Sequence, residues 1–364
     1  MRRERHPARR DALRSALAAE QLDGLIVTHL PNIRYLTGFS GTAGVVMVLR
    51  EAVVLLTDFR YRTQAEAEVG DAVRLEVVPS DVWERLGHVL AEYPGTEALG
   101  YESQAVTVAD AARFTRFNGR LRLRPVAHVV ERLRVAKDAD EVGAIRAAAG
   151  IAGEAVEATL RQVRVGLREL DVAALLESEL RWRGSEWHPF PTIVASGPRS
   201  ALPHARTSPR VLERGDWLLL DFGAQVDGYC ADITRTVVVG AEPDERQQAV
   251  YHMVREAQQA ARGAIRAGMT GRDADALARG VIEARGFGDA FGHSLGHGLG
   301  LEVHEGPRLS RANADPLPAH AVVTVEPGAY FPGWGGVRIE DDLYLGPQGA
   351  ELLSDGRTEL LVVG

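Results

Sequence analysis

Residues 292–305 read G-H-S-L-G-H-G-L-G-L-E-V-H-E and place three histidines, His293, His297 and His304, among four glycines. This many glycines disfavour a regular helix, so the spacing of four between the first two histidines does not indicate a helical metal site. Glycines instead let the backbone approach a neighbouring group closely, as a ligand site requires. The segment therefore predicts a ligand site rather than a regular helix or a core strand.

Acidic residues end apolar, strand-like runs on both sides of this segment. Asp221 ends W-L-L-L-D and Glu326 ends V-V-T-V-E, and each is followed by x-Gly-Ala. A second acid follows on another short run, Asp232 11 residues after the first and Glu340 14 residues after the second. An unpaired carboxylate is costly to bury, so these four acids are expected to have cationic partners.

Metal ions are the partners that fit this set. Four carboxylates and the imidazole of His297 in one core would repel one another unless cations lay among them. Two divalent ions would balance four negative charges. Oxygen-rich ligation with a single histidine favours Mn²⁺ or a similar ion over a thiolate-type zinc site, so we expect manganese, with cobalt or zinc as alternatives.

These residues resemble a known family. The set Asp221, Asp232, His297, Glu326 and Glu340 is similar to the five-ligand pattern of the dinuclear pita-bread metallopeptidases. The motifs S-G-P-R-S-A-L-P-H-A around His204 and L-E-V-H-E around His304 resemble the Xaa-Pro branch of that family, aminopeptidase P and prolidase. The resemblance covers essentially the whole chain. It implies an α/β N-terminal domain followed by an α+β pita-bread catalytic domain.

The resemblance also implies roles for individual residues. A hydroxide bridging the two metals would attack the peptide bond, and Glu326 would move its proton to the leaving group. His204 would face the substrate, His304 would hydrogen-bond the carbonyl or oxyanion, and His293 would line the substrate pocket. From strand alternation, Arg338 lies on the face of Glu340 and is expected to support that ligand.

Other polar residues near these motifs receive weaker assignments. Thr234 shares the strand face of Asp232 and is expected to donate a hydrogen bond near the metals. Arg308, four residues after His304, could bind the free carboxylate of a dipeptide, as a prolidase requires. Asp341 and Asp342 are interpreted as solvated acids without a role. The N-terminal residues Tyr35, Asp58, Arg60 and Tyr61 fit the family motifs or simple turn and capping roles.

Composition narrows the setting. The chain has 364 residues, 45% of them hydrophobic, and a net charge of −8, which argues against a general nucleic-acid binder. No apolar run is long enough to span a membrane, and the start lacks the apolar core of a secretory signal. The single cysteine, Cys230, suits a reducing compartment, so a cytoplasmic protein is expected. The family resemblance also implies a homodimer.

Two domains are expected, over residues 1–130 and 131–364. The first alternates helical patterns (near 8–20, 61–69, 81–91 and 107–117) with strand-like runs, which predicts an α/β domain. After the boundary, Asp138 and Glu141 form a capping-box pattern at the start of a long helix. Further along, Gly166–Gly184 and Gly268–Gly286 align without a gap, each after a long helical pattern. This repeat predicts two halves related by a pseudo-twofold axis, each supplying one carboxylate pair.

The expected function is hydrolysis of the bond between an N-terminal residue and a following proline, as in aminopeptidase P, with proline-containing peptides as substrates. Prolidase, which cleaves Xaa-Pro dipeptides, is the first alternative. Methionine aminopeptidase shares the ligand set but typically lacks a full N-terminal α/β domain. A non-catalytic peptide-binding protein of this fold usually loses ligands, whereas all five are present here.

Overall fold

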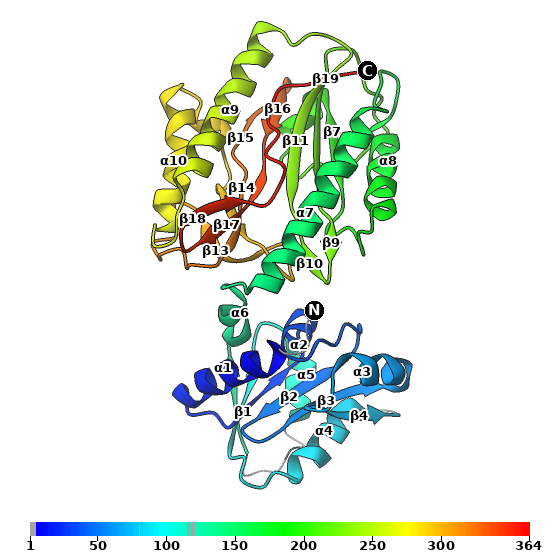
Figure 1. Ribbon diagram of the computed structural model, residues 1–364, viewed down its shortest axis with the longest axis vertical. Coiled ribbons are helices and arrows are strands. Elements are labelled where there is room, and N and C mark those ends of the chain that lie inside the picture. Colours follow the sequence, from blue (N-terminus) through cyan, green and yellow to red (C-terminus); the bar gives the residue numbers. More distant parts are fainter. Residues whose placement is uncertain (1–4, 80, 115–116, 118–120) are drawn as a thin grey trace. The chain divides into compact units, whose positions relative to one another are not determined.

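The computed structural model describes residues 5–79, 81–114, 117 and 121–364, and divides into two compact units, Met1–Arg134 and Val135–Gly364 (Figure 1). The arginine-rich start at residues 1–4 lies outside the described residues. So do residues 115–116, near the end of the helix expected over 107–117. None of the helices in the described ranges is long and apolar enough to cross a membrane.

The first unit is built on a six-stranded mixed sheet with the strand order β4-β3-β2-β1-β5-β6. The strands are β1 (Gly24–Val27), β2 (Val45–Leu49), β3 (Val53–Asp58), β4 (Arg74–Val78), β5 (Ala98–Glu102) and β6 (Arg122–Val126). Strand β1 pairs parallel with β5 and antiparallel with β2. Strands β1 and β2 are buried throughout, because every side chain in them is covered on one face or the other.

Helices surround this sheet. They are α1 (Arg5–Ala19), α2 (Leu30–Thr37), α3 (Arg62–Glu68), α4 (Val82–Ala91), α5 (Val108–Arg113) and α6 (Val129–Arg134), with a short 3₁₀ turn η1 (Phe59–Tyr61) before α3. Helices α2 and α6 lie where no helix was expected. Asp58 caps η1 by accepting the N–H of Arg60, so in this unit it has a local structural contact.

A residue distant in the sequence binds the backbone just before the start of helix α2. The carboxylate of Glu102, at the end of β5, accepts hydrogen bonds from the N–H groups of Thr28 (2.7 Å) and His29 (2.8 Å), just ahead of the helix. A negative charge at this position satisfies free N–H groups and opposes the helix dipole favourably. At the other end, Gly38 adopts a left-handed conformation with φ 82° and closes the helix.

The second unit contains two helix pairs that correspond to the sequence repeat. The pairs are α7 (Ala139–Leu160) with α8 (Glu169–Trp182), and α9 (Glu245–Ala264) with α10 (Gly271–Ala284). The four repeat glycines, Gly166, Gly184, Gly268 and Gly286, all have positive φ, of 94°, 99°, 84° and 80°. Equivalent left-handed turns therefore begin and end the second helix of each pair, as two copies of one unit would require.

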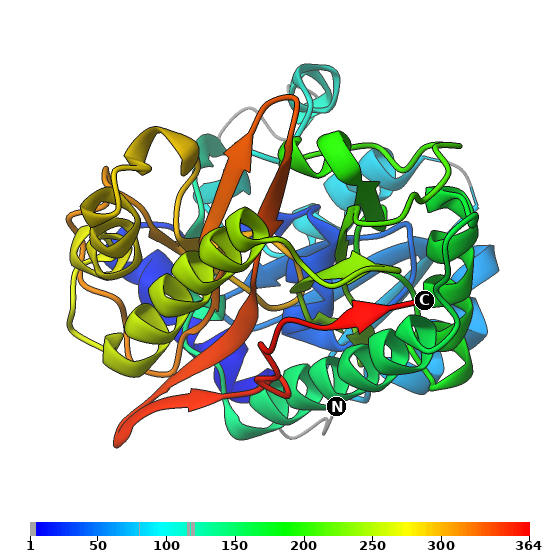
Figure 2. The ribbon, with the colours of Figure 1, turned by 90° about the horizontal axis from the view of Figure 1, so that it is seen from above.

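The strands of this unit form one sheet for each helix pair. The first, in the order β19-β11-β8-β7, contains β7 (Ile193–Ser196), β8 (Trp217–Phe222), β11 (Ile233–Val239) and β19 (Val362–Val363). The second, in the order β13-β12-β14-β17-β18, contains β12 (Gly296–Gly298), β13 (Glu305–Leu309), β14 (Val322–Val325), β17 (Asp341–Gly346) and β18 (Gly349–Leu352). Two ribbons complete the set, β9 (Gln225–Val226) with β10 (Tyr229–Cys230) and β15 (Gly328–Phe331) with β16 (Gly335–Arg338). Within this unit the strands lie between the α7–α8 and α9–α10 pairs (Figure 2).

The histidine-rich segment contains a core strand, which was not expected. Residues Gly296–Gly298 form the buried strand β12, paired with β13 on one side and β14 on the other. A side chain at Gly298 would overlap the carbonyl oxygen of Gly306, so only glycine permits this pairing. The close approach that glycine allows serves a core strand here, and that strand holds His297 in the sheet.

Candidate metal centre and substrate cavity

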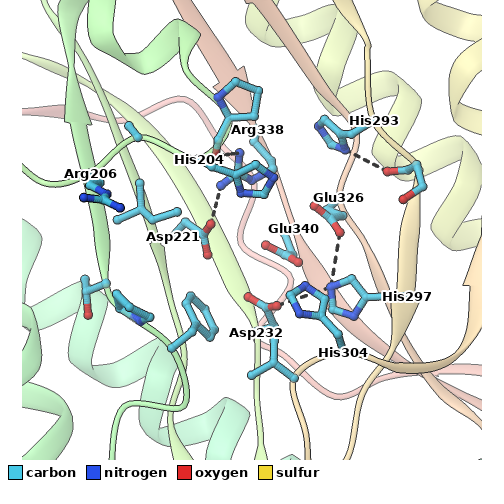
Figure 3. A pocket seen from close by; sticks show the side chains of 18 of the residues that line it. His204, Arg206, Asp221, Asp232, His293, His297, His304, Glu326, Arg338 and Glu340 are labelled. Atoms are coloured by element: carbon cyan, nitrogen blue, oxygen red, sulfur yellow. Dashed lines mark hydrogen bonds and ion pairs between the residues drawn. The ribbon is translucent and has the colours of Figure 1, made fainter. Parts of the chain in front are cut away.

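One cavity of about 700 Å³ in the second unit brings the predicted site residues together (Figure 3). Its volume is in the range of sites for small ligands. The sequence-predicted residues that line it are His204, Asp221, Asp232, His293, His297, His304, Arg308, Glu326, Arg338 and Glu340.

The four carboxylates reach the cavity from the ends of strands in both sheets. Asp221, in β8, pairs in register with Thr234 of β11, and Asp232 immediately precedes β11. Glu326 immediately follows β14, and its N–H donates to the carbonyl of Leu295 at 2.9 Å. Glu340 immediately precedes β17. Each half of the unit therefore supplies one acid pair.

Three of these groups form a compact cluster. Ligand atoms of Asp232, His297 and Glu340 all lie within 4.8 Å of one another, and all three residues are buried. The Nε2 atom of His297 is 3.6 Å from Asp232 Oδ2 and 3.5 Å from Glu326 Oε1. Asp221 lies outside this compact group, and its carboxylate is paired with the guanidinium of Arg338.

The electrostatics of the cluster call for cations. Burial, reinforced by the charges of neighbouring carboxylates, raises the pKa of Asp232 and of Glu326 well above the usual values. Burial and the nearby Asp221 raise the pKa of Glu340 to about 8. Carboxylates in this setting are ionised at neutral pH only when positive charge lies between them. The donor set of carboxylate oxygens and one imidazole nitrogen therefore fits divalent metal ions.

The tautomer of His297 also suits a ligand. Its Nδ1 lies 3.0 Å from the carbonyl oxygen of Gly298, which can only accept, so Nδ1 carries the proton. Burial lowers the pKa of His297 to about 3 and keeps the ring neutral. The free lone pair on Nε2 therefore faces Asp232 and Glu326, as metal ligation by histidine requires.

Arg338 and Thr234 form a hydrogen-bonded network that contacts carboxylates from both halves of the cluster. The Nε of Arg338 donates to the hydroxyl of Thr234 at 3.0 Å, and its Nη2 donates to Asp221. The Thr234 hydroxyl in turn donates to Oε2 of Glu340 at 2.5 Å. Thr234 and Arg338 thus orient two of the four carboxylates, one in each acid pair.

A hydrogen-bonded chain leads from Arg338 to His293. The hydroxyl of Tyr330 accepts from Arg338 Nη1 at 2.8 Å and donates to His293 Nε2 at 2.9 Å. The other nitrogen of His293 donates to the carbonyl of Ser294, and burial lowers its pKa to about 4, so the ring is neutral. Sequence reasoning missed Tyr330. Its even spacing from Glu326 along a strand-like run was a signal that both could share one side.

The remaining predicted residues lie nearer the solvent. His304 and Arg308 are exposed, and the ring of His304 is 4.3 Å from that of His297. Although part of His304 is exposed, partial burial of its ring and the charge of Arg308 lower its pKa, which favours a neutral ring. His204 is also exposed, on the loop after the 3₁₀ turn η3 (Gly197–Ala201). Arg206, on the same loop, lines the cavity and was missed by sequence reasoning.

Known proteins match this chain over both units. Residues 143–347, more than half of the chain, match the model of metallopeptidase family M24, and residues 9–136 match the creatinase/prolidase N-terminal domain. The chain belongs to metallopeptidase family M24. Family members are hydrolases that depend on metal ions, in agreement with the carboxylate–histidine cluster. The expected two-domain architecture is also confirmed.

Individual M24 relatives carry two different names. A structure of an Xaa-Pro dipeptidase from Bacillus anthracis is 39% identical, with a TM-score of 0.94, and the match covers 98% of this chain and all of that one. A structure of an X-Pro aminopeptidase from Thermotoga maritima is 38% identical, with a TM-score of 0.90 and coverage of 97% and 99%. An Xaa-Pro dipeptidase from Pyrococcus furiosus is 36% identical over 93% of this chain and 95% of its own length.

The interpretation of Asp341 and Asp342 as solvated acids was wrong. Both are fully buried in this M24 chain, at 0% exposure. Asp341 accepts from Arg235 at 2.9 Å and from Gln258 at 2.6 Å, and Asp342 accepts from the N–H of Asp232 at 3.2 Å. A run of three acids looks solvated in sequence, but Arg235, Gln258 and the N–H of Asp232, which contact the last two acids, lie more than 80 residues away in the chain.

Proposed function

We propose that this chain is an exopeptidase that hydrolyses the bond between an N-terminal residue and a following proline. The observation that carries the proposal is the buried cluster of Asp232, His297 and Glu340 at an open cavity that also contains free cationic side chains. The names of the Bacillus anthracis and Thermotoga maritima relatives support the specificity for proline in the second position.

The residues that would hold the metals are Asp221, Asp232, His297, Glu326 and Glu340. Two Mn²⁺ ions fit this oxygen-rich set, with Co²⁺ or Zn²⁺ as alternatives. When bound, such ions lower the pKa of water toward neutrality and polarise a peptide carbonyl.

The chain's own residues would handle the protons. Glu326, whose Oε1 lies 3.5 Å from Nε2 of His297 in the cluster, would carry a proton to the leaving group. The proline nitrogen carries no hydrogen in the peptide bond, so it needs that proton to leave. His304, neutral and at the edge of the cluster, would hydrogen-bond the carbonyl oxygen, and His204 and His293 would contact the substrate.

The choice between dipeptides and longer peptides depends on Arg308. Its guanidinium lines the cavity, is exposed, and has no carboxylate partner within the described ranges. A free guanidinium beside His304 suits the C-terminal carboxylate of a dipeptide. The sequence alone favoured an aminopeptidase, but this free cation and the dipeptidase names of two relatives favour Xaa-Pro dipeptidase activity. Xaa-Pro aminopeptidase activity is the second candidate, favoured by the Thermotoga maritima relative.

The test compares three substrates with Mn²⁺-loaded protein: an Xaa-Pro dipeptide, an Xaa-Pro-Yaa tripeptide and a Met-Ala-Ser peptide. Faster dipeptide cleavage is expected, with Arg308→Ala raising its KM by roughly tenfold or more. The exposed Arg266→Ala, outside the cavity, is the matched control. Faster tripeptide cleavage would identify an aminopeptidase. Cleavage of Met-Ala-Ser alone, or no cleavage and no bound metal, would refute the proposal.

A homodimer and a cytoplasmic location also belong to this proposal. Light scattering over working concentrations tests the first, because a monomer throughout would contradict it. Fractionation of the cells that produce the protein tests the second.

A further inference from the structure

The guanidinium of Arg206 is a free cation in the substrate cavity. The side chain lines the cavity and is exposed, two residues after His204. Figure 3 shows it on the opposite side of the carboxylate cluster from His293. Across the part of the chain that the structure describes, it has neither an ion-pair partner nor a side-chain hydrogen bond.

The backbone around Arg206 is held on both sides. The carbonyl of Pro203 accepts from Arg338 Nη1 at 3.3 Å, and the carbonyl of Arg206 itself accepts from Arg199. The hydroxyl of Thr207 accepts an N–H of strand β7 at 2.9 Å. The loop is therefore fixed before any ligand arrives, and binding through Arg206 orders only one side chain.

Neighbouring arginines show what Arg206 lacks. Arg199 lies 3.2 Å from the buried carboxylate of Glu169, and Arg210 pairs with Asp216. Inside the cavity, the carboxylate of Asp221 is already paired with Arg338. Among the described residues no carboxylate is paired with Arg206, so its exposed guanidinium is available to a carboxylate of a bound molecule.

We propose that Arg206 is a specificity-determining residue that binds a carboxylate of the peptide substrate. The proposal rests on the proposed Xaa-Pro peptidase function. The planar guanidinium of Arg206 suits two parallel hydrogen bonds to a carboxylate. Two sources supply that group: an acidic side chain on the first residue, or the C-terminal carboxylate of a peptide longer than a dipeptide. Arg308 is a separate cation and takes the C-terminal carboxylate of a dipeptide.

Paired substrates separate the two sources. The first pair is Glu-Pro and Gln-Pro, which differ only in the charge of the first side chain. The second pair is an Xaa-Pro-Ala tripeptide with a free C-terminus and its amide. For at least one pair, the carboxylate member is expected to have the higher kcat/KM, with the difference mainly in KM.

Replacing Arg206 should remove that preference. We expect Arg206→Gln to reduce the carboxylate-to-neutral ratio of kcat/KM by roughly three- to tenfold, because the group is exposed but its loop is fixed. The neutral substrates should be cleaved at nearly the wild-type rate. Arg206→Lys should retain part of the preference, and Arg214→Gln, an exposed arginine outside the cavity, should leave it unchanged.

The outcomes for Arg206 and for the proposed function differ. Xaa-Pro cleavage with unchanged ratios in both pairs would overturn the role of Arg206 and leave the peptidase assignment standing. If no Xaa-Pro peptide is cleaved, the peptidase assignment fails, and calorimetric binding of the same four peptides then decides the role of Arg206. Equal binding ratios in wild type and Arg206→Gln would overturn it, and a ratio reduced in the variant would support it.

Discussion

The ammonium group of Lys137 lies 3.2 Å from Oε2 of Glu305, and both side chains are buried, with exposures of 1% and 6%. The other oxygen of Glu305 accepts the N–H of Glu302 at 3.0 Å. Glu305 directly follows His304, so this ion pair anchors the end of the segment that presents His304 to the cavity. The pair joins residues 168 positions apart in the chain.

Removing one partner of this ion pair should destabilise the protein strongly. Lys137→Met removes this cation from beside the buried carboxylate of Glu305, at an expected cost of about 3–5 kcal/mol in the free energy of unfolding. Denaturant unfolding measures it. Arg146→Met, which breaks the exposed pair with Glu351, is the control and should cost less than about 1 kcal/mol. Equal losses in the free energy of unfolding for the two variants would show that the buried ion pair stabilises the protein no more than the exposed one.

The hydroxyl of Thr234 should affect metal affinity. Thr234→Val removes the hydrogen bond to Glu340 and the acceptor for Arg338, so Mn²⁺ is expected to bind about 10- to 100-fold more weakly. Thr236→Val is the matched control, because the Thr236 hydroxyl is on the same strand and, among the described residues, hydrogen-bonds the backbone of Arg338 and no carboxylate. Calorimetric titration with Mn²⁺ compares the two. A similar affinity in both variants would contradict an orienting role for Thr234.

Metal removal should make stability depend on pH in a defined direction. The pKa of Glu340 is raised from its usual value of 4.5 to about 8, so without metal the folded state favours the protonated form. Its contribution to stability is complete below about pH 4.5 and is lost as the pH rises toward about 8. Metal affinity changes the opposite way, because ligands must be deprotonated.

We therefore expect the difference in Tm between Mn²⁺-loaded and chelator-treated protein to widen from about pH 5 to about pH 8. Scanning calorimetry of both forms across this range measures it. A difference that stays constant or narrows as the pH rises would show that the buried acids are not coupled to metal binding.

Two glycines of the histidine-rich segment should respond differently to a methyl group. Gly298→Ala places a Cβ atom against the backbone carbonyl of Gly306 and should separate β12 from β13, with a loss of several kcal/mol in stability and of activity. Gly292→Ala meets open space and should change stability by about 0.5 kcal/mol or less. Thermal unfolding and metal content of both variants test this. Tolerance of alanine at position 298 would contradict the packing of β12.

The sequence by itself determined the elements whose signals are local. The capping box of Asp138 and Glu141 begins α7 as predicted, and the face of Val142, Ile145 and Ala149 is buried. The gapless repeat of Gly166–Gly184 in Gly268–Gly286, each after a long helical pattern, predicted the two halves, because these signals lie within single stretches of the chain. The acids at the ends of apolar runs also indicated a common site. A carboxylate buried at the end of such a run needs a partner, and this requirement can be recognised from the run alone.

Tertiary structure decided whatever depends on a partner far away in the chain. Helix α2 begins where Glu102, more than 70 residues later, caps it. Asp341 and Asp342 are buried because Arg235, Gln258 and the backbone of Asp232 reach them. Arg338 pairs with Asp221, 117 residues away in the chain. The identity of a residue shows that it needs a partner, but only the fold determines which groups come close enough to be that partner.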